Sequence, residues 1–372
     1  MPHSEDESFF DKKRPWSRRK NLILKEYLPP YFAKMIGAIG KPILVVDGFA
    51  GRGKFKKGDE PGSPLVIAEC IQGAMAKHPS HSISLLAIEE KEKNYEPLKD
   101  YLAPYPFART EQGRFLDFLA EIEQSAKTKT VFLYVDPYAT EGFDWESLDS
   151  IFKHLRQSGS SIEILINLNV FAFTRCARAA LAKETGSSVH VDRLNSVAGG
   201  DWWQNAVAKK LEFDAEVAEI TAGFCSRFNS RFTEVCYHPI KEKPSDKVPK
   251  YVLLFASRST VALRLMNDAA VKSLGMFADQ NQPKEATLFE TRGTDIVPDP
   301  ADLSQYIRSA IRVLQRATRF DLATQVIRTI FGVYAASDIN RDISDLINRG
   351  ILTSSTGKSR INDKVEVWLS NA

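Results

Sequence analysis

The stretch KPILVVDGFAGRG, residues 41–53, decides the fold of this chain. Its apolar run is typical of a parallel strand buried on both faces, and the glycines after Asp47 allow a sharp turn and a close approach to a ligand. Further apolar runs follow, each with a helical pattern after it: ISLLAIEE (83–90), TVFLYVDPY (130–138) and SIEILINLNV (161–170). This alternation predicts an α/β fold with a Rossmann-like, doubly wound sheet, and the late pair RFTEVCYHPI and KYVLLFASRS predicts an antiparallel edge.

The length of the chain predicts more than one domain. At 372 residues the chain exceeds the usual range of about 100–200 residues per domain. We expect a helical N-terminal leader over residues 1–40, with the basic stretch Arg18-Arg19-Lys20 solvated, and a cofactor-binding domain over residues 41–280. A polar stretch near residues 278–304 then marks a boundary. Residues 305–372 show three helical patterns, a turn and a strand, which predicts a winged helix-turn-helix domain.

Charge and cysteine content exclude several classes of protein. Fifty basic and 47 acidic residues leave a net charge of +3, so any surface for nucleic acid must be local. The four cysteines form no CxxC pair and no nearby histidine completes a zinc-ligand spacing, so we expect neither a disulfide framework nor a metal site. The chain lacks the apolar core of a signal peptide and any run of about 18–20 apolar residues, so we expect a cytoplasmic protein without a membrane segment.

Three ligands compete for the glycine loop. A dinucleotide loop needs glycine where Lys56 stands, and a P-loop needs a hydroxyl where Phe55 stands. The third ligand is S-adenosylmethionine, whose methyltransferases carry a D-x-F-x-G-x-G-like loop after the first strand. The cofactor-binding residues expected from this match are Asp47, Gly48, Phe49, Gly51 and Gly53. A plain structural turn after a core strand is the alternative.

Two strand ends support the cofactor interpretation. Glu89 ends the second apolar run, where an acid would bind ribose hydroxyls. Asp136, Pro137 and Tyr138 end a further run and are similar to the D/N-P-P-Y/F tetrad of methyltransferases that act on the amino groups of bases, although this chain has a single proline there. In that role Asp136 and the carbonyl beside Pro137 accept hydrogen bonds from the amine, and Tyr138 stacks on the acceptor.

The order of motifs resembles the three-Cys-motif partner (TcmP) family. The matching segments are W-S-R-R-K-x-x-I-L-x-x-Y-L (Trp16 to Leu28), V-D-G-F-A-G-R-G, G-S-P-L (Gly62 to Leu65), V-D-P-Y and Y-V-L-L-F-A-S (Tyr251 to Ser257). The resemblance implies a methyltransferase-like protein with a Rossmann-type adenosylmethionine domain. It also implies a separate partner, similar to radical adenosylmethionine enzymes, that carries the three-cysteine motif.

Two other functions stay open beside a methyltransferase acting on nucleic acid or its components. The first is a non-catalytic nucleic-acid-binding or adaptor protein with a relic cofactor fold, in which Lys358 and Arg360 at the wing would contact DNA or RNA. The second is a P-loop ATPase that uses Lys54 and Asp136.

Overall fold

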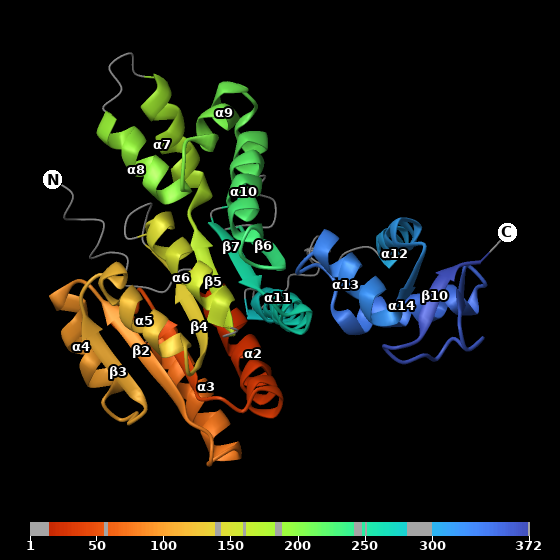
Figure 1. The fold of residues 1–372 in the computed structure, drawn as a ribbon, viewed down its shortest axis with the longest axis horizontal. Coiled ribbons are helices and arrows are strands. Elements are labelled where there is room, and N and C mark those ends of the chain that lie inside the picture. The colour runs from red at the N-terminus through yellow and green to blue at the C-terminus, as the bar shows by residue number, and fades with distance from the viewer. Residues whose placement is uncertain are drawn as a thin grey trace, which may run out of the picture. The chain divides into compact units, whose positions relative to one another are not determined.

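The computed structural model describes residues 15–55, 59–137, 143–158, 161–182, 188–241, 248–249, 251–280 and 300–370. The chain divides into two compact units, Met1–Ser259 and Thr260–Ala372. We describe each unit by itself; Figure 1 labels their elements.

The first unit is built on a seven-stranded sheet with the order β3-β2-β1-β4-β5-β7-β6. The strands are β1 (Ile43–Asp47), β2 (Ile83–Glu89), β3 (Ala108–Gln112), β4 (Thr130–Val135), β5 (Ile162–Leu168), β6 (Glu234–Ile240) and β7 (Tyr251–Ser257). Strands β1 to β5 are parallel, and β7 pairs antiparallel with both β5 and β6. The expected α/β class with a doubly wound, Rossmann-like sheet is therefore confirmed.

Helices cover both faces of this sheet (Figure 1). They are α2 (Pro15–Ala38), α3 (Ser63–Lys77), α4 (Glu92–Leu102), α5 (Leu119–Ala126), α6 (Trp145–Ser158), α7 (Val170–Ala182), α8 (Ser188–Ala198), α9 (Trp202–Ala208) and α10 (Phe213–Asn229), with a 3-10 turn at Phe115–Phe118. Side chains of β4 alternate between the faces, as strand geometry requires. Phe132 packs against Tyr27 of α2, whereas Leu133 joins the core formed with α5 and α6.

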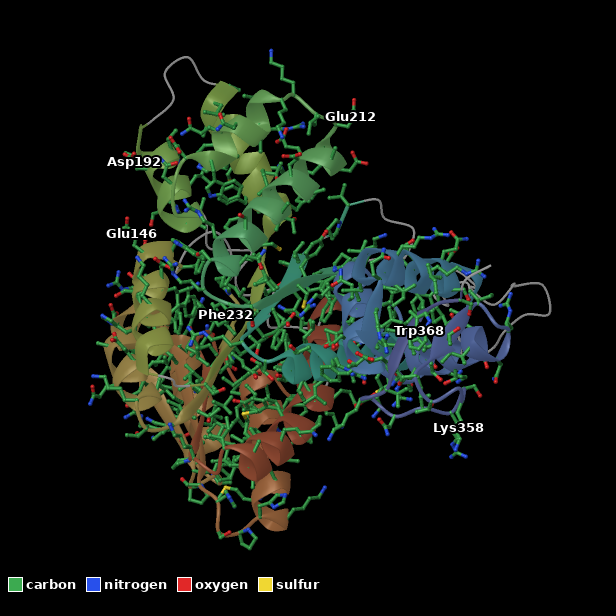
Figure 2. All side chains as sticks on the ribbon, turned by 45° about the vertical axis from the view of Figure 1, so that its right-hand side comes forward. Glu146, Asp192, Glu212, Phe232, Lys358 and Trp368 are labelled. Carbon is green, nitrogen blue, oxygen red and sulfur yellow. The ribbon has the colours of Figure 1, made fainter. Side chains whose placement is uncertain are left out.

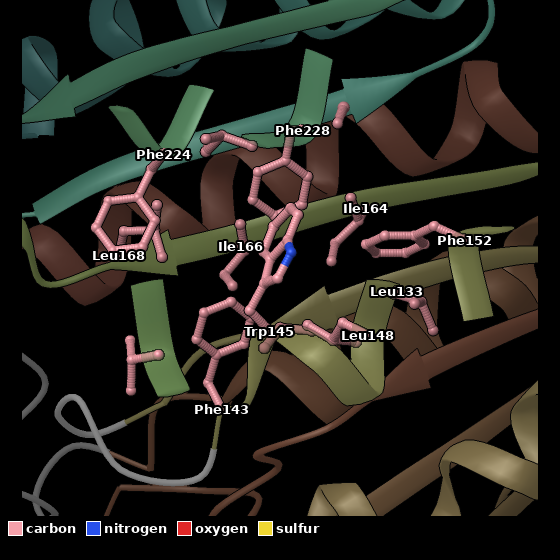
Figure 3. Close-up of a cluster of buried hydrophobic side chains, with 14 of the residues drawn as sticks. Leu133, Phe143, Trp145, Leu148, Phe152, Ile164, Ile166, Leu168, Phe224 and Phe228 are labelled. Atoms are coloured by element: carbon pink, nitrogen blue, oxygen red, sulfur yellow. The ribbon is translucent and has the colours of Figure 1, made fainter. Parts of the chain in front are cut away.

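An aromatic core lies between β4, β5 and helices α6 and α10. Figure 3 shows Trp145 at its centre, and the rings of Trp145 and Phe228 meet edge to face with centroids 5.0 Å apart. Gly199 lies beside this indole, because a Cβ there would approach Trp145 Cδ1 to 2.3 Å. This core holds the carboxyl ends of β4 and β5 in place.

The N-terminal segment is an integral part of the first unit, and the expectation of a solvated leader is wrong for the part that the structure describes. Tyr27 and Tyr31 of α2 are fully buried, and Arg19 and Lys20 are only 6% exposed. Arg19 contacts His238 Nε2, and burial lowers the pKa of Arg19 to about 10. Arg19 and Lys20 point into the protein because their partners, His238 of β6 and Asp136 after β4, lie in the interior.

Strand β3 has no counterpart in the sequence prediction. Its residues read ARTEQ and none of them is buried. An edge strand without an apolar run gives no period-2 signal, so only its pairing with β2 identifies it.

The second unit contains α11 (Thr260–Gln280), α12 (Pro300–Leu314), α13 (Arg319–Thr329) and α14 (Ala336–Asn348), with the antiparallel sheet β8-β10-β9. The strands are β8 (Arg316–Thr318), β9 (Leu352–Ser354) and β10 (Glu366–Leu369). Residues 260–280, which the sequence analysis placed with the first domain, belong here. The buried Asn267 of α11 donates to Tyr334 O at 2.9 Å and accepts from Gly332 N at 2.9 Å, which ties α11 to the loop before α14.

Candidate functional site

A cleft lies at the carboxyl ends of β1, β4 and β5. The chain leaves β1 toward β2 and β3 and then returns to β4 on the other side, so the order reverses between β1 and β4. Open α/β sheets bind ligands at such a switch point. The cleft opens to solvent, and α2, the glycine loop, the start of α3 and the strand ends line it. The lining residues are Trp16, Ser17, Lys20, Asn21, Phe49, Ala50, Gly51, Arg52, Gly53, Lys54, Phe55, Gly62, Ser63, Asp136, Pro137, Asn167 and Tyr251.

The glycine loop adopts backbone conformations that favour glycine. Gly51 has φ 62° and Gly53 has φ 81°, both in the left-handed region. Gly53 O accepts a hydrogen bond from Gly62 N at 2.6 Å, which closes the loop against the start of α3. Gly48 has no positive φ but lies against Phe115, whose Cδ2 would be 2.7 Å from an added Cβ.

Asp47 lies beneath the loop and is fully buried. Its Oδ1 accepts a hydrogen bond from Phe49 N at 3.3 Å, and its Oδ2 has no partner among the described residues. Burial raises the pKa of Asp47 to about 7, although the Ser63 hydroxyl and Phe49 N–H oppose the rise. Asp47 therefore carries an acceptor oxygen without a donor just below the cleft.

Glu89 holds the loop from the neighbouring strand. Its Oε2 accepts from Gly51 N at 2.9 Å, and its Oε1 accepts from Lys91 N at 2.9 Å and Asn94 Nδ2 at 3.3 Å. The side chain is 5% exposed, and burial raises its pKa. Glu89 thus fixes the glycine loop and does not line the cleft.

Asp136 is the centre of a polar network. Lys20 Nζ donates to Oδ2 at 2.5 Å, Tyr134 donates its hydroxyl to the same oxygen at 3.1 Å, and Asn167 Nδ2 donates to Oδ1 at 2.7 Å. A carboxylate offers about four lone-pair positions, so one remains for a ligand among the described contacts. Three elements, α2, β4 and β5, therefore position one carboxylate.

Positive charge gathers at the mouth of the cleft. Lys20, Arg52 and Lys54 line it together with the first residues of α3, where the helix dipole is positive. Lys54 is paired with the exposed Asp59 at 3.0 Å, whereas Arg18 beside the cleft is paired with Glu60. This surface suits an anionic group such as a carboxylate or a phosphate.

The structure brings most predicted site residues together. Phe49, Gly51, Gly53, Asp136 and Pro137 line the cleft, while Asp47, Gly48 and Glu89 form its support. Tyr138 lies outside the described residues. Sequence reasoning did not assign Lys20 or Asn167 to the site, because Lys20 belongs to a basic stretch that was expected to be solvated and an asparagine inside an apolar strand shows no motif of its own.

The P-loop alternative receives no support from the loop. Phe55 occupies the position of the metal-binding hydroxyl and is 9% exposed, with its ring in the protein interior. The Mg²⁺ ligand that such an enzyme needs is therefore replaced by a hydrophobic anchor.

In the second unit, Lys358 and Arg360 lie in the loop between β9 and β10 and are exposed. Figure 2 shows Lys358 pointing away from the strands. Three other basic side chains of this unit form ion pairs: Arg316 with Glu366, Arg319 with Asp363 and Arg341 with Asp338. The loop between β9 and β10 therefore presents two exposed cationic side chains.

The remaining sequence expectations concern cysteines, metals and membranes. All four cysteines are free thiols. Within the described residues no group of three metal-ligating side chains comes together, and no helix has the length and apolarity to cross a membrane.

Comparisons with known proteins give distant neighbours. No protein-family model and no curated protein matches the sequence. Among solved structures, a putative caffeoyl-CoA O-methyltransferase from Staphylococcus aureus is 10% identical over 62% of this chain and 82% of its own, with a TM-score of 0.32. Human methyltransferase-like protein 13, solved with SAH, is 12% identical over 73% of this chain and 97% of its own, with a TM-score of 0.34. A protein from Legionella pneumophila is 10% identical over 66% and 85%, with a TM-score of 0.39. At these sequence identities and TM-scores the comparisons say nothing about the activity of this chain.

Proposed function

We propose that this chain is an S-adenosylmethionine-dependent methyltransferase that acts on an amino group of a nucleic acid or one of its components. The observation that carries the proposal is the cleft at the β1/β4 switch point, where the loop from Asp47 to Gly53 faces Asp136 and Pro137. A cofactor loop and an amine-binding carboxylate in one cleft are what methyl transfer to nitrogen requires.

The residues around the loop fit the methionine end of the cofactor. Its carboxylate matches Arg52 and the start of α3, which offer a guanidinium group and the positive end of a helix dipole. The unpartnered Oδ2 of Asp47 lies just below and matches its ammonium group. When bound, this cofactor supplies an electrophilic methyl group, and Gly51 and Gly53 leave room for it beside the backbone.

The acceptor amine is bound by Asp136 in this proposal. Lys20, Tyr134 and Asn167 hold the carboxylate still, and its remaining lone pair accepts one N–H of the amine. The carbonyl beside Pro137 accepts the other. Two fixed N–H groups direct the nitrogen lone pair, which improves its alignment for attack.

Calorimetric titration with SAH, the demethylated cofactor, tests the cofactor site. We expect binding by the wild type and loss of binding in Gly51→Trp, which fills the cleft. Gly73→Trp is the matched control, because Gly73 lies on α3 with open space around it. Absence of SAH binding by the wild type, or equal binding by both variants, contradicts the proposal.

The second unit is proposed to be a winged helix-turn-helix that contacts DNA or RNA. Its order of helix, strand, two helices and two strands supports this, with the β9–β10 loop as the wing that presents Lys358 and Arg360. A partner that carries a three-cysteine motif is the further expectation from the TcmP resemblance. Incubation with labelled adenosylmethionine and total nucleic acid, with and without such a partner, separates an active enzyme from an adaptor with a relic cofactor fold.

A further inference from the structure

A second, much smaller pocket adjoins the cleft at the ends of β4 and β5. Pro137 and Asn167 belong to both, and Figure 3 shows three further walls of the pocket, Phe143, Leu168 and Phe224. The free volume of this pocket is about 20 Å³. A single water molecule needs about 10–15 Å³ of such space. The pocket therefore has room for one water molecule and is too small for an organic ligand.

Asn167 has a buried acceptor without a donor at this pocket. A carboxylate only accepts hydrogen bonds at neutral pH, so the atom that lies 2.7 Å from Asp136 Oδ1 is the donor Asn167 Nδ2. The other terminal atom of the amide is Oδ1, which accepts no hydrogen bond among the described residues, and Asn167 is only 1% exposed. Such a buried acceptor is costly unless a bound molecule donates to it.

Asn169 brings a donor to the same pocket. Its Oδ1 accepts a hydrogen bond from Ala172 N at 3.0 Å, as expected of a residue that caps the start of α7. This contact fixes the orientation of the amide, so the other terminal atom is Nδ2, which donates to no described residue. Asn167 and Asn169 are two positions apart and both line the pocket. An acceptor and a donor that lack protein partners among the described residues therefore lie at one small pocket.

We infer that the pocket binds one water molecule, which accepts a hydrogen bond from Asn169 Nδ2 and donates one to Asn167 Oδ1. A buried water makes about two to four hydrogen bonds, and these two side chains supply the lower number. The water holds the Asn167 amide in the orientation that donates to Asp136. Asn169 is thus a positioning residue for Asp136, although it acts through the water and Asn167.

The consequence for the acceptor amine rests on the proposed function, in which Asp136 binds that amine. An Asn167 amide turned by half a rotation would place its oxygen against Asp136 Oδ1, and two acceptors repel each other. Asp136 would then lose its donor from β5, and its carboxylate would be free to turn away from the direction in which the amine binds. The water prevents this by stabilising one orientation of the amide.

A crystal structure of the full chain tests the water site. We expect one water peak within about 3.2 Å of both Asn167 Oδ1 and Asn169 Nδ2. In Asn169→Ser the hydroxyl still caps α7 but no longer reaches the water, so the peak should disappear. Asn169→Asp is the matched control, because it keeps the cap and offers an oxygen to which the water donates, so the peak should remain. A wild-type pocket without a water peak, or the same peak in Asn169→Ser, overturns the inference.

The exchange of the Asn167 side-chain amide protons with solvent tests the positioning role. It is measured by NMR on the full chain without cofactor. We expect exchange about tenfold faster in Asn169→Ser than in the wild type, and the wild-type rate in Asn169→Asp. Both variants keep the cap of α7, so a role of Asn169 in the helix alone predicts equal exchange in all three proteins. That result contradicts the inference.

The proposed function and this inference can fail separately. Titration with SAH reports on the cofactor site, whereas the water peak and the amide exchange are measured without cofactor. A water peak in a protein that does not bind SAH contradicts the proposed function alone. Binding of SAH by a protein whose pocket holds no water contradicts this inference alone.

Discussion

Lys20 Nζ lies 2.5 Å from Asp136 Oδ2, so an ion pair joins α2 to the end of β4 across 116 positions of sequence. The side chains are 7% and 22% exposed, so this pair is shielded from water. Replacement of Lys20 by Met keeps much of the length of the chain but removes the counter-charge. We expect Lys20→Met to lower the free energy of unfolding by about 1–3 kcal/mol in urea denaturation.

Lys25→Met is the control for this change, since Lys25 lies on the same helix and is exposed. Its effect should stay within about 0.5 kcal/mol. In the Lys20→Met background, Asp136→Asn should recover part of the lost stability, because it removes the uncompensated charge. Equal stability of the two lysine variants would show that the pair contributes nothing.

Gly48 is predicted to tolerate no side chain. An added Cβ would lie 2.7 Å from Phe115 Cδ2, so Gly48→Ala should lower the free energy of unfolding by about 1–3 kcal/mol. Thermal or urea denaturation measures this. Gly73→Ala is the opposite case, because Gly73 lies inside α3 and nothing lies within 4 Å of its added Cβ. This substitution should stabilise the protein by about 0.5–1 kcal/mol. Gly48→Ala combined with Phe115→Leu should relieve part of the clash.

Glu163 is predicted to make stability depend on pH. Burial raises its pKa to about 7, although hydroxyl groups of Tyr27 and Ser257 donate to it. In the unfolded chain the carboxyl group loses its proton near its ordinary pKa of 4.5. Between these values the folded state binds more protons, so the free energy of unfolding falls as pH rises, and the loss is complete above about pH 7.

Glu163→Gln should remove this contribution. A shift of one pKa unit corresponds to about 1.4 kcal/mol, so Glu163 accounts for at most about 3 kcal/mol of the loss between about pH 5 and about pH 8. Urea midpoints at the two pH values measure the change. The residual slope contains the other carboxyl groups whose pKa is raised by burial, among them Asp47 with a pKa of about 7 and Glu89. Glu92→Gln, at an exposed acid of α4, should leave the slope as in the wild type.

Glu89 is predicted to position the cofactor loop. Glu89→Ala removes the acceptor of Gly51 N, so amide exchange at Gly51 should accelerate and SAH affinity should fall about tenfold to a hundredfold. Glu90→Ala is the control, because Glu90 is exposed beside it. Faster exchange with unchanged SAH affinity would place the ligand elsewhere.

Lys358 and Arg360 are predicted to contact phosphates. Substitution of both by Ala in the full chain should weaken duplex DNA binding and make its salt dependence shallower by about two phosphate contacts. Fluorescence anisotropy at several salt concentrations measures this. The control is Lys99→Ala with Lys127→Ala, which removes the same charge from the first unit. If both double variants weaken binding alike, the wing has no specific role.

Much of the sheet could be predicted because its strands are apolar on both faces. Every buried strand of the first unit followed from such a run, and Asp47, Glu89 and Asp136 were located by their places at strand ends. Strand β3 could not be found this way, because its residues are polar and lie at an edge. The short β8 in the second unit was missed for a similar reason, since Arg316–Thr318 has one buried residue.

The site was predicted less completely than the fold. Motifs identify residues adjacent to a strand, but Lys20 reaches Asp136 from a helix far away in the sequence. The role of Asn167 depends on which amide atom faces Asp136, which only the three-dimensional arrangement decides. Glu89 was expected to bind ribose hydroxyls, yet its hydrogen bonds within the described residues go to backbone and Asn94, which no spacing argument reveals.

The long-range contacts of helix α2 constrain the order in which the protein folds during synthesis. It is synthesised before every strand, yet its buried contacts are with β4, β5, β6 and β7, including Arg19 with His238 across 219 positions. The cleft wall formed by Trp16 and Lys20 therefore cannot close until the last strands have left the ribosome. Contacts of such long separation form slowly, so α2 stays exposed or bound to another protein while about 200 further residues are synthesised.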